Sequence, residues 1–238
     1  MNNTLVLLSG GIDSYVLADL AKKNSDNVYG LTFNYAQVNE KEIECAREIA
    51  KYMQFEEHIV INIDFGIWKD RYMDNILVKG ADSGSESAYV PARNMIFLSY
   101  AVGIAESLNI NNIAIGTTIA DFRVNKNSSG GFADCSPKFL KDIQVVARDI
   151  LGNRIKIYAP LVNTTKAQII KYGIDNGLQF EKTWSCYQNK QKPCGKCMAC
   201  QIRIYGFYKC NKEDSLEYEE DFFQLAHKVE AEWEKRDN

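Results

Sequence analysis

The sequence is poor in histidine, in excess charge and in long apolar runs. Its two histidines, His58 and His227, lie outside every motif, so acid–base catalysis by histidine is not expected. Lys and Arg number 28 against 31 Asp and Glu, so the net charge of −3 supplies no general attraction to nucleic acid or to an anionic membrane. No apolar run approaches the roughly 20 residues that span a bilayer, and residues 1–4 hold no basic region before a signal-like core. These absences predict a cytoplasmic protein.

Short aliphatic runs alternate with segments of helical spacing along the chain. The expected strands are residues 5–8, 28–34, 57–63, 113–116 and 155–158, and the expected helices are 38–52, 92–108, 138–151 and 165–176. This alternation predicts an α/β fold with a doubly wound, mostly parallel sheet. With 238 residues, the chain has room for one such domain, expected over 1–180, and a small helical C-terminal region over 181–238 that packs on it.

The segment LVLLSGGIDS ends a predicted strand at Gly10 and Gly11 and then begins a helix. Backbone N–H groups that no side chain shields lie there at a positive helix terminus, where phosphate oxygens bind. The loop contains no lysine and the chain has no GxxxxGK[ST] motif, so it does not grip a nucleotide as kinases or GTPases do. Two glycines alone would indicate a simple turn, but the full SGGIDS sequence after the first strand favours phosphate binding.

Four of the seven cysteines are crowded into fifteen residues, as Cys186, Cys194, Cys197 and Cys200. They supply four soft ligands for a tetrahedral Zn²⁺ ion, and Gly195 permits the tight turn between them. Because all four positions would be protein ligands, no site is left for a catalytic water, and the zinc is expected to be structural. Spacing alone leaves an iron–sulfur cluster open.

The glycine loop resembles the SGGxDS loop of the N-type ATP pyrophosphatases, which holds the β and γ phosphates while a substrate oxygen attacks the α phosphate. Further segments narrow the resemblance: YVPARNMIF, LVNTTKAQII, TWSCY and PCGKCMAC, in that order. Together they resemble the 7-cyano-7-deazaguanine synthase family of the queuosine pathway, from residue 5 to about 207. The fold implied is like that of the adenine nucleotide alpha hydrolases.

The resemblance implies an ATP-dependent C–N ligase that forms AMP and pyrophosphate. The carboxylate of 7-carboxy-7-deazaguanine would be adenylated and captured by ammonia as an amide, and a second ATP would expel the amide oxygen to leave the nitrile. The cofactors implied are ATP, Mg²⁺ and structural Zn²⁺. Because no glutaminase domain fits in this length, free ammonia or a partner must supply the nitrogen.

The resemblance also implies roles for residues. The expected catalytic residues are Asp13, Arg93 and Lys166, with Asp13 holding the metal or ordering the loop and the two cations offsetting phosphate charge. The nucleotide-binding residues expected are Leu8, Ser9, Gly10, Gly11, Asp13, Ser14, Asn94 and Gly116. The substrate-binding residues expected are Tyr35, Gln37, Asp121, Asp134 and Trp184, the last either stacking on the deazaguanine or simply packing.

Two segments depart from the family pattern. Family members usually read close to FDYGQRH where this chain has FNYAQVN, and the stretch after Asp121 is longer and more basic here than in the family. Both fall where the base or the amine should lie, which keeps open a diverged relative that joins the deazaguanine carboxylate to another amine, such as a protein. A zinc-ribbon nucleic-acid-binding protein is a second alternative, which the net charge and the SGGIDS loop oppose. The acidic stretch 213–220 is expected to be helical, and the apolar side chains that follow it leave a homodimer open.

Overall fold

The computed structural model describes residues 1–35, 40–64, 92–122, 132–188 and 190–237. Five parallel strands form one sheet in the order β3-β2-β1-β4-β5. Their bounds are Asn3–Leu7 for β1, Asn27–Asn34 for β2, Glu57–Asn62 for β3, Asn112–Ala114 for β4 and Lys156–Tyr158 for β5. Each strand lies within a few residues of its predicted position, and the predicted doubly wound α/β fold is confirmed.

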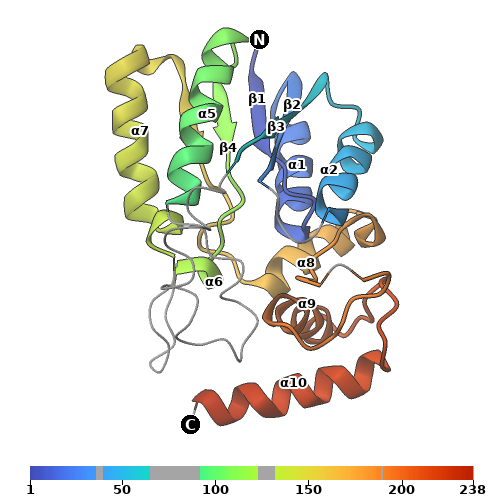
Figure 1. The fold of residues 1–238 in the computed structure, drawn as a ribbon. Helices are drawn as coiled ribbons and strands as arrows, with labels where there is room; N and C mark the ends of the chain where they lie inside the picture. The colour runs from blue at the N-terminus through green and yellow to red at the C-terminus, as the bar shows by residue number, and fades with distance from the viewer. Residues whose placement is uncertain (36–39, 65–91, 123–131, 189, 238) are drawn as a thin grey trace.

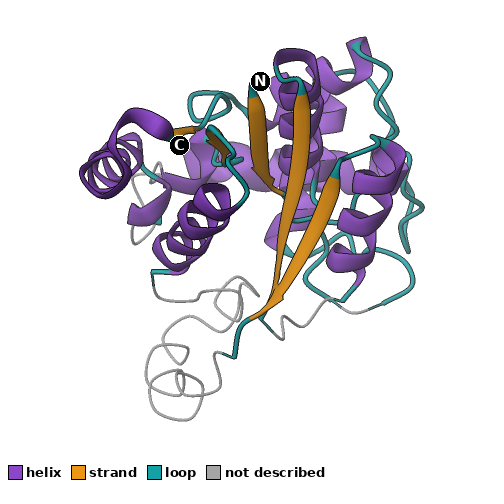
Figure 2. Cartoon of the chain, turned by 90° about the horizontal axis from the view of Figure 1, so that it is seen from above, coloured by secondary structure: helices purple, strands orange, loops and turns teal. Residues whose placement is uncertain are grey.

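Helices cover both faces of the sheet, as the view along it shows (Figure 2). The helices are α1 (Ile12–Asn24), α2 (Lys41–Tyr52), α5 (Arg93–Ser107), α6 (Ile119–Phe122), α7 (Pro137–Leu151), α8 (Lys166–Asp175), α9 (Met198–Lys209) and α10 (Phe222–Asp237). In Figure 1, α5 and α7 lie on one side of the strands and α1 and α2 on the other, with α8, α9 and α10 below. None of the helices in the described ranges has the length and apolar character needed to cross a membrane.

Alternating residues of the central strand supply two separate cores. Leu5 packs toward α5 and α7 with Leu98 and Ala147, whereas Val6 packs toward α1, α2, α8 and α9 with Val16 and Ile204. Such two-sided burial explains why β1 is apolar on both faces, as expected of a parallel sheet with helices on each side. The second core continues without a break from α1 into the cysteine-rich region and α10.

The predicted helix over 213–220 is wrong. Between α9 and α10 the chain forms no helix. Several of its acidic side chains form ion pairs with other parts of the protein. Asp214 is buried against Arg203, and three glutamates pair with lysines of the cysteine-rich loop: Lys192–Glu217, Lys190–Glu219 and Lys196–Glu220. Of these pairs, only Arg203–Asp214 is fully buried, so it is the one expected to hold the segment most firmly.

Candidate active site

The glycine loop joins the carboxyl end of β1 to the first turn of α1. Gly10 adopts a positive φ of 85°, and a Cβ there would lie 2.0 Å from the Glu42 carbonyl oxygen, so only glycine fits. Two serines tie the loop together, since Ser9 Oγ donates to Ser14 Oγ at 3.1 Å and Ser14 Oγ donates to the Gly11 carbonyl at 3.0 Å. The loop therefore presents its backbone at the positive start of a helix, as anion binding requires.

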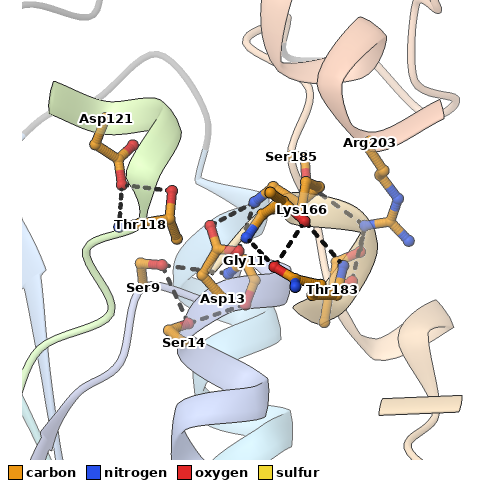
Figure 3. Close-up of polar contacts among 12 residues, drawn as sticks. Ser9, Gly11, Asp13, Ser14, Thr118, Asp121, Lys166, Thr183, Ser185 and Arg203 are labelled. Atoms are coloured by element: carbon orange, nitrogen blue, oxygen red, sulfur yellow. Dashed lines mark hydrogen bonds and ion pairs between the residues drawn. The ribbon is translucent and has the colours of Figure 1, made fainter. Parts of the chain in front are cut away.

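Lys166 reaches the loop from the start of α8. Its ammonium lies 2.5 Å from both carboxylate oxygens of Asp13, in the first turn of α1 (Figure 3). Thr165 and Gln168 form the predicted capping box, which fixes where α8 begins and so where Lys166 leaves the backbone. The side chains of Lys166 and Asp13 are 18% and 27% exposed, which leaves the pair accessible to a ligand.

A second carboxylate, Asp121, lies near this ion pair. One of its oxygens accepts from the Thr118 backbone N–H at 2.6 Å and from the Thr118 hydroxyl at 2.9 Å (Figure 3). Burial, and then the charge of Asp13, raise the pKa of Asp121. Gly116 precedes this turn, and a Cβ there would lie 3.6 Å from the Asp13 and Ser14 backbone, so Gly116 lies beside the loop. Two carboxylates close enough for the charge of one to raise the pKa of the other offer hard oxygen ligands that suit Mg²⁺.

The start of α5 carries a second polar group. Arg93 donates from Nη1 to the Tyr35 hydroxyl at 3.3 Å, and its guanidinium carbon lies 5.9 Å from the centre of that ring. Asp134 accepts from the Asn94 backbone N–H at 2.9 Å. The start of this helix thus already faces a carboxylate of the chain itself.

The thiol of Cys135 borders the same group and accepts from Asn94 Nδ2 at 3.1 Å. Burial, together with the charges of Asp121 and Asp134, raises the pKa of Cys135 to about 12. A thiol held protonated in this way is a poor nucleophile.

The four cysteine sulfurs lie within 4.8 Å of one another. Backbone N–H groups of Gln188 and Cys194 donate to the Cys186 sulfur at 3.3 and 3.4 Å, and those of Lys196 and Cys197 donate to the Cys194 sulfur at 3.4 and 3.3 Å. Such donors stabilise thiolates. Four soft ligands at one buried point fit a tetrahedral zinc ion, so the cluster can hold the predicted metal.

Trp184 joins the cysteine cluster to the glycine loop. Its backbone N–H donates to the Gly10 carbonyl at 3.0 Å, and its indole N–H donates to the Cys186 carbonyl at 3.0 Å. The side chain is 6% exposed, and the Lys41 ammonium lies 4.2 Å from a ring centroid. In the described residues this indole is packed, and stacking on a substrate stays a prediction.

Comparison with known proteins places the glycine loop and the cysteine cluster inside one matched region. A family model described as queuosine biosynthesis protein QueC matches residues 3–211. The chain belongs to the QueC family. The 7-cyano-7-deazaguanine synthase of Prochlorococcus marinus (strain MIT 9301) is 37% identical over 215 residues, 86% of this chain and 93% of the relative. That of Acetivibrio thermocellus is 36% identical over 228 residues, 92% of this chain and 99% of the relative.

A solved structure confirms the fold class at greater distance. A 4-thiouridine synthetase in complex with RNA and with bound ATP superposes with a TM-score of 0.50 at 18% identity, over 99% of this chain and 53% of that one. At this identity the likeness extends to the fold only.

The structure brings most of the predicted QueC-family residues to the carboxyl ends of the strands. Asp13, Lys166, Asp121 and Gly116 gather at the glycine loop, and Tyr35, Arg93, Asn94 and Asp134 form the neighbouring group. Leu8 is buried just after β1, where its backbone N–H donates to the Leu31 carbonyl at 2.8 Å and its carbonyl accepts from the Thr32 hydroxyl at 2.6 Å. Gln37 lies outside the described residues. The catalytic, nucleotide-binding and substrate-binding roles of all these residues stay predictions.

Sequence reasoning missed Glu42. Burial raises the pKa of Glu42 to about 7, and the charge of Arg93 opposes that rise. Glu42 lies in the first turn of α2, which packs so closely on the loop that its carbonyl excludes any side chain at residue 10. Its position just after the second strand was the available signal, because that edge of a parallel sheet carries the site.

Proposed function

We propose that this protein is an ATP-dependent ligase that converts 7-carboxy-7-deazaguanine and ammonia to 7-cyano-7-deazaguanine through an adenylate and an amide. The observation that carries the proposal is the SGGIDS loop with Lys166 paired to Asp13 beside it. Relatives that share more than a third of their residues with this chain over most of its length are named for that synthase, which supplies the substrate class.

The loop suits the activation of a carboxylate. Its N–H groups would hold the β and γ phosphates of ATP, and Ser9 and Ser14 would add hydroxyl donors. Lys166 would transfer part of its interaction from Asp13 to the phosphates as negative charge grows on them. Asp13 would hold Mg²⁺, which would supply positive charge to offset the negative charge of the phosphates.

The group around Arg93 is proposed to receive the deazaguanine. Tyr35 offers an aromatic face, and Asp121 and Asp134 offer acceptors for the N–H groups of a guanine-like ring. Arg93 would face the substrate carboxylate whose oxygen attacks the α phosphate, since a guanidinium matches that anion. Free ammonia or a partner protein would supply the nitrogen, zinc at the four cysteines would be structural, and a homodimer is compatible with this arrangement. The α/β part over 1–180 would perform the chemistry, with 181–238 supporting it.

The relatives do not favour the two alternatives. Transfer to a protein amine rests only on the altered segments near Gln37 and after Asp121, which lie largely outside the described residues. A nucleic-acid-binding ribbon fits poorly with a cysteine cluster whose sulfurs belong to the same buried core as α1 and α2.

The test is turnover of 7-carboxy-7-deazaguanine with ATP, Mg²⁺ and ammonium, with products identified by mass spectrometry and pyrophosphate followed in parallel. Nitrile product with two pyrophosphates per turnover is expected. The variant Gly10→Ala should abolish pyrophosphate release because of the contact with Glu42. Gly152→Ala is the matched control, since Gly152 also has a positive φ but nothing lies within 4 Å of its added Cβ. Absence of pyrophosphate from the wild-type protein would refute the proposal.

A further inference from the structure

Helix α9 crosses α8 at a glycine in its interior, Gly206. A Cβ built there would lie 2.6 Å from Ile170 Cδ1 and 2.8 Å from Lys166 Cγ. Glycine weakens a helix interior relative to alanine, so its presence here calls for a reason. Close approach of the Lys166 side chain supplies one.

The two contacts differ in how they can yield. Ile170 Cδ1 is the end of a buried side chain, and its loss in Ile170→Val would remove that contact, whereas Lys166 Cγ lies in the middle of a stem that ends at Asp13. Its ammonium is held 2.5 Å from both Asp13 oxygens. A methyl group at residue 206 would therefore have to change the Lys166 rotamer, and with it the place of the ammonium.

We propose that Gly206 is a positioning residue for Lys166. Without a side chain at 206, the Lys166 stem passes between α8 and α9 in the one direction that brings its ammonium to Asp13 and the glycine loop. The catalytic consequence rests on the function proposed above for that loop. The geometric claim does not, because it concerns only where the ammonium lies.

The test is Gly206→Ala, compared with two other helix glycines. Gly103 is exposed in α5 with nothing within 4 Å of an added Cβ, so Gly103→Ala controls for helix propensity. Gly173 lies in α8 with its added Cβ 2.2 Å from Phe180 Cζ, so Gly173→Ala controls for general packing damage. Each variant is assayed for pyrophosphate release, for thermal unfolding and for acylation of Lys166 mapped by mass spectrometry.

Gly206→Ala should lower kcat by up to about 100-fold, the scale of an ångström-sized misplacement, with a smaller effect on the KM for ATP. It should have no further effect in a Lys166→Ala background, because the two changes act through one ammonium. Lys166 should be acylated faster in Gly206→Ala than in the wild type, and at the wild-type rate in both control variants.

Equal effects of Gly206→Ala with and without Lys166, or recovery of kcat when Ile170→Val is added, would overturn the proposal. If Gly206→Ala does not fold, the double variant with Ile170→Val removes one contact and keeps that with Lys166, so the same comparison can be made. Faster acylation in a protein whose wild type releases no pyrophosphate would support the geometric claim and refute the function. Unchanged acylation in an active protein would refute the claim about Gly206 alone.

Discussion

Lys166 and Asp13 form the charged pair that distinguishes this glycine loop from a simple turn. Each belongs to the first turn of its helix, so two positive helix ends converge on one carboxylate and one ammonium. An incoming triphosphate would compete with Asp13 for Lys166. Under the proposed function, the pair would hold the site in order until a nucleotide arrives.

Replacing Lys166 with alanine should lower kcat for pyrophosphate release by about 100-fold or more, as for loss of one donor to developing charge. The matched control is Lys171→Ala on the same helix, because Lys171 is exposed and pairs only with Asp175 among the contacts found in the described residues. Steady-state pyrophosphate assays on both variants make the comparison. Equal loss in both would show that the charge of α8, and not this ammonium, matters.

Glu42 should make stability depend on pH. Its pKa is raised from 4.5 in the ordinary case to about 7 in the folded protein, so its contribution to stability is complete below 4.5 and is lost as pH rises to about 7. Glu42→Gln cannot titrate. The Tm of the wild type relative to that of Glu42→Gln should therefore fall between pH 5 and pH 8, measured by calorimetry. Parallel curves over this range would contradict the shifted pKa.

The residue types of the loop were predictable because their conformation is local, whereas their partners were not. SGGIDS alone indicates a phosphate site, and TTKAQ alone indicates a capped helix start. That Asp134 caps α5, and that Glu42 is buried beside Arg93, depend on segments forty or more residues apart. No local pattern carries such information.

At the scale of elements, α9 holds the segment that supports the glycine loop. Arg203, 1% exposed, donates to both oxygens of Asp214 at 2.6 and 2.9 Å and to the Thr183 hydroxyl at 2.8 Å. Figure 3 shows this guanidinium facing Thr183 and Ser185, which are the residues before and after Trp184 in the sequence. The helix therefore fixes the backbone that binds Gly10.

Arg203→Ala should destabilise the fold by about 3–5 kcal/mol, because it leaves Asp214 buried and unpaired. Lys209→Ala, on the same helix, removes a solvent-screened pair with Glu230 and should leave the free energy of unfolding close to that of the wild type. Urea unfolding with a common m-value measures both. A loss below about 1 kcal/mol in Arg203→Ala would mean that Asp214 finds another partner or water.

Periodicity predicted the regular elements well, but the prediction failed at the acidic stretch 213–220. The helix was expected there from acidic composition alone, but Asp214 is buried against Arg203 and three glutamates of the stretch pair with lysines. Charge patterns with no apolar stripe say little about which partner a segment will find.

Across the whole molecule, the cysteine cluster and the glycine loop are two ends of one connected structure. Cys186 binds the Trp184 indole through its carbonyl, and the Trp184 backbone binds Gly10. Lys41 of α2 donates to the Gln191 carbonyl at 2.9 Å and so ties the cysteine-rich loop to the helix beside Gly10. The proposed zinc at the cysteines should therefore affect the affinity of the glycine loop for ATP.

Cys200→Ser should lose its metal and bind ATP more weakly, by about 10-fold or more, as expected when a preorganised site must be ordered by its ligand. Cys210→Ser is the control, since Cys210 lies outside the cluster and its thiol donates to the Ala167 carbonyl. Metal content by mass spectrometry and ATP affinity by calorimetry are the measurements. If a metal-free Cys200→Ser protein bound ATP as tightly as the wild type, the prediction that the metal site supports ATP binding would be wrong.

The order of synthesis gives the spread of the site along the chain a further meaning. The glycine loop and the strand before it, β1, emerge early from the ribosome. In the sheet, however, β1 lies between β2 and β4, which are made later. Lys166 and Trp184 follow only in the last third of the chain. Since domains fold as units during synthesis, a chain cut short before Lys166 would carry the complete loop and remain unable to use it. Under the function proposed above, aborted translation would thus leave an inert fragment and not a partial enzyme that spends ATP and releases reactive acyl adenylate into the cell.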